Sequence, residues 1–64
     1  MNTTTAKKYF ILAWTARRNS KRHGGISYHL AATEQEAEKR LRHWIHDRYP
    51  GYRIVVKLDG TLPA

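Results

Sequence analysis

The sequence predicts a small α+β domain in which two strands, one helix and a third strand follow one another along the chain. Two observations carry most of this prediction: an aromatic and β-branched run over 9–16, and a capped amphipathic segment over 33–49. Shorter alternating runs over 26–31 and 52–58 supply the other two strands. The expected fold is therefore ββαβ.

The predicted first strand, Tyr9–Ala16, is apolar on both of its faces, as a central strand often is. The second strand, Ile26–Ala31, alternates between apolar and polar residues. The segment between them, residues 17–25, is predicted to be the loop of a β-hairpin. In this loop Gly24 and Gly25 are expected to supply positive φ angles where the chain enters the second strand.

The helix is predicted to run from Thr33 to Tyr49. Thr33 and Glu36 have the spacing of a capping box, in which the Thr33 hydroxyl accepts from the Glu36 amide and the Glu36 carboxylate reaches back to the Thr33 amide. Pro50 and Gly51 end the helix. Apolar residues recur at helical spacing on one face, and we expect all of them in the core: Ala37, Leu41, Trp44 and Ile45.

The helix connects the second strand to the third, Tyr52–Leu58, so these two strands run parallel and flank the first. The prediction is a three-stranded antiparallel or mixed sheet of order 2-1-3 with one helix packed on one face. The side chains expected beneath the helix are Phe10, Leu12, Trp14, Tyr28, Leu30, Ile54, Val56 and Leu58. Those expected on the open face are Tyr9, Ile11, Ala13, His29, Arg53, Val55 and Lys57.

Sixty-four residues make one domain, residues 1–64, and without cysteine only packing or self-association can stabilise it. Residues 1–7 are expected to form a flexible lead. A turn at Asp59-Gly60 is expected to start a loose tail over 59–64. Three roles stay open for the open face: a nucleic-acid platform, a surface covered by a second copy in a homodimer, or no role.

Charge is the main functional signal in the sequence. The chain has 12 Lys and Arg against 5 Asp and Glu, a formal net charge of +7, which favours a polyanionic partner. Residues 17–25 carry four of the positive charges and no acidic residue, so they predict a basic hairpin tip; the alternative is a solvated loop that keeps the protein soluble. The residues predicted to contact nucleic acid or an acidic partner are Arg17, Arg18, Lys21, Arg22, His23, Lys39, Arg42, Arg53 and Lys57.

Catalysis and metal binding find little support in the sequence. His43 and His46 lie near each other on the helix, and Asp47 follows His43 by four residues, so a metal could be imagined there. No third ligand of good quality accompanies the two histidines, and cationic neighbours oppose metal binding. Ser20 and His23 lack an orienting carboxylate. We therefore expect no enzyme activity, no metal and no cofactor.

No membrane association is expected either. The apolar run over 9–16 is too short to span a bilayer. Arg17 and Arg18 stand where a signal peptide would need small residues. A cytoplasmic location is the expectation.

The layout of strand, basic turn and strand, followed by the Thr33-Glu34-Gln35-Glu36-Ala37 helix start, resembles the small DNA-binding domains at the N-termini of phage-type integrases. The resemblance covers residues 9–44 and implies a sheet that enters the major groove of DNA. This chain departs from that pattern in having two strands before the helix and one after it.

Two functions are thus predicted. The first is a small, non-enzymatic nucleic-acid-binding module, for DNA or RNA, that contacts phosphates through the basic tip and the helix face. The alternative is an accessory or inhibitor protein of the phage or mobile-element type. It would bind an acidic or nucleic-acid-binding surface of a larger complex.

Overall fold

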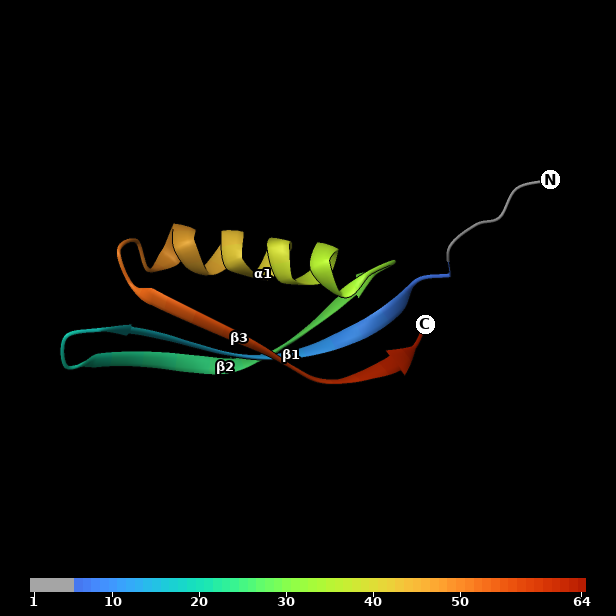
Figure 1. Ribbon diagram of the computed structural model, residues 1–64, viewed down its shortest axis with the longest axis horizontal. Helices are drawn as coiled ribbons and strands as arrows, with labels where there is room; N and C mark the ends of the chain where they lie inside the picture. Colours follow the sequence, from blue (N-terminus) through green and yellow to red (C-terminus); the bar gives the residue numbers. More distant parts are fainter. Residues whose placement is uncertain (1–5) are drawn as a thin grey trace.

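The computed structural model describes residues 6–64 and arranges them as a three-stranded antiparallel sheet with one helix across one face (Figure 1). The elements in chain order are β1 (Lys8–Arg18), β2 (Lys21–Ala31), α1 (Glu34–Arg48) and β3 (Arg53–Pro63). Both outer strands pair antiparallel with β1, in the order β2-β1-β3. The predicted fold class and strand order are confirmed. Most of the predicted flexible lead lies outside the described residues.

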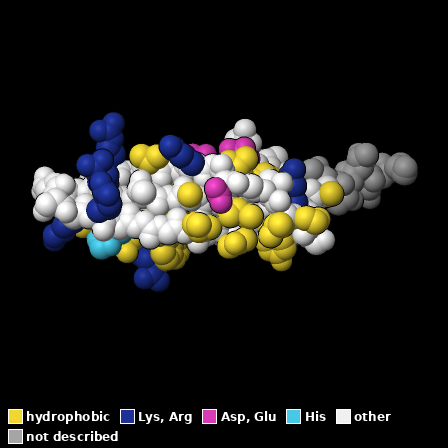
Figure 2. Space-filling view, turned by 90° about the horizontal axis from the view of Figure 1, so that it is seen from below, with side chains coloured by type: hydrophobic (Ala, Val, Ile, Leu, Met, Phe, Trp, Pro, Cys, Tyr) yellow, Lys and Arg dark blue, Asp and Glu magenta, His cyan; other side chains and the backbone are white. Residues whose placement is uncertain are grey.

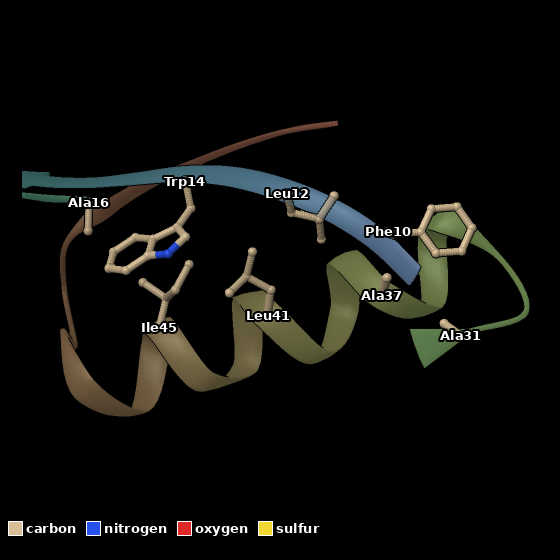
Figure 3. Close-up of a cluster of buried hydrophobic side chains, with 8 residues drawn as sticks. All are labelled: Phe10, Leu12, Trp14, Ala16, Ala31, Ala37, Leu41 and Ile45. Carbon is tan, nitrogen blue, oxygen red and sulfur yellow. The ribbon is translucent and has the colours of Figure 1, made fainter. Parts of the chain in front are cut away.

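The hydrophobic core lies between β1 and α1 (Figure 3). Alternate residues of β1 point toward the helix, and the buried side chains of α1 are four positions apart, so one face of the strand packs against one face of the helix. Leu12, Leu41 and Ile45 are the largest fully buried side chains. The complete buried set is Phe10, Leu12, Trp14, Ala16, Ala31, Ala37, Leu41 and Ile45.

Local signals define both ends of α1. The Thr33 hydroxyl accepts from the Glu36 amide at 3.2 Å, as predicted. The second half of the expected capping box is replaced, because the Glu36 carboxylate pairs with the Arg40 guanidinium at 2.6 Å within the helix. At the other end, Gly51 has φ of 83°, a conformation that glycine adopts without strain, and the chain turns there into β3.

The hairpin between β1 and β2 is much tighter than predicted. The strands continue to Arg18 and resume at Lys21, so only Asn19 and Ser20 form the turn. Asn19 has the positive φ, 55°, which asparagine tolerates better than most residues. The expected loop over 17–25 is thus mostly strand.

Gly24 and Gly25 lie inside β2 and have a packing role instead of the predicted turn role. A Cβ atom on Gly24 would lie 2.9 Å from the Trp14 carbonyl oxygen, and one on Gly25 would lie 3.3 Å from Trp14 Nε1. Close approach of the Trp14 carbonyl therefore excludes a side chain at position 24, whereas a side chain at position 25 would require the Trp14 indole to shift by a few tenths of an ångström.

This tight turn sets a register that corrects the predicted faces of β2. Tyr28 lies opposite Ile11 and Leu30 opposite Tyr9, which places both on the open face rather than beneath the helix. His29 lies opposite Phe10 and therefore occupies the covered face, not the open one. A pairing shifted by one residue exchanges the two faces of a strand, and the turn length decides which pairing forms.

The expected turn at Asp59-Gly60 and the loose tail after it are also corrected, because β3 continues to Pro63. A register shift brings Leu58 opposite Leu12 and Gly60 opposite Ile11, leaving Asp59 as the extra residue of a β-bulge. Since the bulge reverses the alternation, the end of β3 places Leu62 on the open face.

The predicted core position of Trp44 is wrong. Trp44 is 44% exposed, whereas Trp14 is 9% exposed and lies between the helix and Gly25. The two indoles meet edge to face, with ring centroids 5.8 Å apart, and the Arg48 guanidinium lies over the outer ring. Trp44 thus covers the edge of the core.

Replacing each tryptophan in turn tests this assignment. Trp14→Ala should lower the free energy of unfolding by about 3–5 kcal/mol, because it leaves a cavity in the core. Trp44→Ala should lower the free energy of unfolding by about 1–2 kcal/mol, because it removes one aromatic pair and the packing of a side chain that is only half buried. Urea unfolding followed by circular dichroism measures both. Equal losses for the two variants would contradict the assignment.

Candidate nucleic-acid interface

Three arginines lie directly beside one another across the sheet. Arg17 on β1 is opposite Arg22 on β2 and also opposite Arg53 on β3. All three side chains are exposed, and their place in the strand alternation puts them on the open face with Val55. Neighbouring strands are about 4.8 Å apart, so this arginine row spans about 10 Å between its outer backbones.

No carboxylate compensates the arginine row. Within residues 6–64 the ion pairs are Arg40 with Glu36 and Arg42 with Glu38, both inside α1. Like charges placed directly opposite on neighbouring strands destabilise a sheet. The row therefore costs stability in the free protein, and an anion bound there would relieve that cost.

Two shallow hollows lie next to the turn at the hairpin end. Arg17 and Arg53 line the first hollow together with Asn19 and Val55. Asn19 also lines the second hollow, whose other lining residues are Arg18, Ser20, Lys21 and Tyr52. The sequence reasoning did not select Asn19. The signal was present, since asparagine between two charged strand ends favours a two-residue turn.

His23 lies away from the arginine row, in an aromatic cluster on the covered face. Its imidazole stacks on Tyr49, with ring centroids 4.4 Å apart and planes 20° from parallel. Tyr52 and Trp14 extend the cluster, at 5.4 and 6.1 Å from the Tyr49 ring. These contacts fix the hairpin end against the end of α1 and the start of β3, so His23 supports the row from behind.

The other predicted site residues are spread over three places. Arg18 and Lys21 flank the turn at the hairpin tip. Lys57 lies on the open face, two residue rows from Arg53. Lys39 and Arg42 belong to α1, in the other layer, where Arg42 bonds Glu38 at 2.7 Å. The nine predicted residues thus form no single surface.

The open face is divided along its length (Figure 2). Lys and Arg side chains are most numerous toward the hairpin end, and hydrophobic side chains are most numerous in the middle and toward the opposite end, with basic and acidic side chains among them. Glu34 and Glu36 lie in the first turn of α1, which starts far from the hairpin tip (Figure 1). A polyanion would therefore be attracted to the hairpin end and repelled from the helix start.

His29 is a half-buried polar side chain of the covered face. Its ring nitrogen Nε2 lies 2.7 Å from the Ser27 hydroxyl oxygen. Burial, followed by the nearby Arg40 charge, lowers the pKa of His29 below its ordinary value. The imidazole is therefore neutral at physiological pH and adds no charge to the surface.

Metal and membrane chemistry find no support in the part of the chain that the structure describes. No group of three or more His, Cys, Asp or Glu residues gathers there in a way that could hold a metal ion. No helix over those residues is long and apolar enough to cross a bilayer. What the hairpin end offers chemically is a set of cationic side chains whose backbone positions are set by strand pairing.

The cost of the arginine row can be measured directly. Arg17→Thr removes the charge that faces both neighbours, and should raise the free energy of unfolding by about 0.2–1 kcal/mol at low salt. The gain should shrink as salt screens the charges. Urea unfolding at two ionic strengths measures both effects.

Lys57→Thr is the matched control for this measurement. It makes the same kind of change on the same face, at a position opposite Ala13 with no cation directly across the strand pair. Lys57→Thr should raise the free energy of unfolding by less than Arg17→Thr does, and this increase should depend little on salt. An equal, equally salt-dependent gain in both variants would contradict a specific repulsion within the row.

Comparison with known proteins gives no match: no protein-family model, no curated protein and no solved structure corresponds to this chain. The function must therefore be argued from the described residues themselves.

Proposed function

We propose that this chain is a cytoplasmic, non-enzymatic nucleic-acid-binding module that contacts phosphates at the hairpin end of its open face. The arginine row of Arg17, Arg22 and Arg53 is the proposed centre of the contact. Arg18 and Lys21 at the tip extend it. Contacts of this kind position a nucleic acid with little sequence preference.

The observation that carries the proposal is the uncompensated arginine row. Three arginine side chains start from directly paired positions on neighbouring strands, and no ion pair among residues 6–64 sets a carboxylate against them. Charged residues on a solvated surface can usually turn apart, but here the backbone pairing fixes their origins. A guanidinium binds phosphate oxygens in a planar, bidentate manner, so the row suits an anion with repeated phosphates.

The dimensions of the row fit consecutive phosphates. Its backbone span of about 10 Å exceeds the rise between nucleotides, about 3.4 Å along one strand of a duplex. Two neighbouring phosphates of one strand can thus lie along it, since their separation along the winding backbone is larger than the rise along the axis. The aromatic cluster around His23 and Tyr49 holds the strands behind the row, so part of the ordering cost is already met before binding.

The helix cations have a minor part in this proposal. Arg42 is engaged with Glu38, and Lys39 lies in the same layer, away from the arginine row. Their contribution would be long-range attraction, which salt screens. This separation between the two groups of cations makes the proposal testable.

The test compares two double variants that remove the same charge. Arg17→Gln with Arg53→Gln removes two members of the row, and Lys39→Gln with Arg42→Gln removes two helix cations. Affinity for a short DNA duplex and for a single strand is measured by fluorescence anisotropy over a salt series. The row variant should lose about tenfold or more in affinity, and its salt slope should fall by roughly two units on the duplex.

The helix variant should bind within about twofold of the wild type, with a nearly unchanged slope. Equal losses in the two variants would contradict a localised site. Weak binding that neither variant alters would exclude nucleic acid as the ligand. The basic row would then fit the acidic surface of a larger protein, an interaction in which these arginines speed association.

A further inference from the structure

The open face carries a large apolar patch beside the arginine row. Six large hydrophobic side chains on this face are each 39–60% exposed: Tyr9, Ile26, Tyr28, Leu30, Val55 and Leu62. The strand registers place them in consecutive rows, with Ile11 and Ala13 between them on β1. Figure 2 shows the hydrophobic side chains gathered in the middle and toward the end away from the hairpin. We define these six residues as the apolar patch.

The size of the apolar patch calls for a partner. A large side chain offers roughly 150–250 Å² when fully exposed, so the six together leave on the order of 500 Å² open. That is near the upper end of what monomeric proteins expose in one patch. Two such patches brought together bury about 1,000 Å², which reaches the lower limit for a specific interface.

We propose that a second copy of this chain covers the apolar patch, with its strands running opposite to those of the first. The two sheets then stack face to face around the middle of β1, between Ile11 and Ala13. Each copy supplies its own apolar patch to the other, as a twofold interface requires. The proposal does not depend on the proposed function.

Charge selects the reversed orientation. If the two sheets stacked with their strands in the same direction, both arginine rows would meet, bringing six guanidinium groups together without a carboxylate. In the reversed orientation each row lies beyond the patch, at opposite ends of the dimer, and Lys57, opposite Ala13, is the cation that stays within the stack. The charges of the two arginine rows therefore favour the reversed arrangement.

The sheet edges and a stacked base are weaker alternatives for this surface. The outer strands contain the features that discourage edge pairing: β3 has the bulge at Asp59 and Pro63 at its end, and β2 has Gly24 within it. A base needs aromatic faces, but four of the six patch residues are aliphatic. A second apolar sheet fits the patch better than either.

The dimer has a consequence that rests on the proposed function. Arg17 lies about five residues along β1 from the proposed centre of the dimer. With a rise of about 3.3 Å per residue on each side of that centre, the two arginine rows of the dimer lie about 33 Å apart. One turn of B-form DNA is about 34–36 Å. Because the two open faces point toward each other in the stack, such a dimer could contact one duplex at two points a turn apart only along the edge of the two sheets.

The first experiment measures mass by light scattering across a concentration series. The wild type should have twice the 7.5 kDa chain mass at high concentration. Ile26→Thr with Tyr28→Thr removes two exposed patch residues outside the core, and this variant should be monomeric. Leu58→Thr changes a hydrophobic residue on the covered face that is 44% exposed, and this variant should remain dimeric.

A monomeric wild type at millimolar concentration would overturn the proposal, as would a dimer that survives the double change. Loss of the dimer in the Leu58 control would do the same, because self-association would not then be specific to the patch. These masses are measured without nucleic acid, so they separate a failed dimer from a failed binding function.

The second experiment leaves the apolar patch unchanged and tests the relative orientation of the two copies. The chain has no cysteine, so Ser20→Cys gives one spin-label site at the hairpin tip. Reversed strands place the two tips about 45 Å apart, whereas strands in the same direction place them within about 20 Å. A long distance by pulsed electron spin resonance supports the proposal, and a short distance overturns it.

Discussion

The turn at Asn19 and Ser20 is the constraint on which the rest of the structure depends. Because only two residues join β1 to β2, Arg18 must lie opposite Lys21, and every later pair follows from that register. The register brings Arg17 and Arg22 together and places Gly25 beneath Trp14. It also assigns Tyr28 to the face that the helix leaves open. A longer loop would release this pairing, and one residue of slippage would exchange the faces of β2.

The resulting sheet has two faces with different tasks. The covered face is stabilised by the packing of β1 against α1, and at its hairpin end by the contacts among His23, Tyr49 and Tyr52. The open face adds little to stability in a single copy, because its apolar patch is half exposed and its arginines repel one another. We propose that both features reflect binding, with phosphates at the basic end and a second copy over the apolar patch.

Much of the fold could be predicted from the sequence, because its signals are local. The Thr33 cap, the helical spacing of Leu41 and Ile45, and the two-sided apolar character of β1 were sufficient to predict the element order and the sheet order.

The faces of β2 could not be predicted in the same way. Both alternating sets of residues in that strand include side chains that can be buried, and the turn length decides which set faces the helix. The position of Trp44 at the edge of the core could not be predicted either, because it depends on how far the helix is rotated over the sheet. For the candidate site, the sequence indicated which residues are charged but not which of them lie side by side. Arg53 lies next to Arg17 only because β3 pairs with β1 in this register.

The central claim is that an anionic ligand meets the hairpin end of the open face and not the helix. Nuclear magnetic resonance with isotope-labelled protein tests it most directly, by following backbone amide and arginine Nε signals during titration with a short DNA duplex. We predict that the signals of Arg17, Arg22 and Arg53 shift most during the titration, and that the signals of residues 38–42 change little. Shifts centred on Lys39 and Arg42, with the arginine row unchanged, would contradict it.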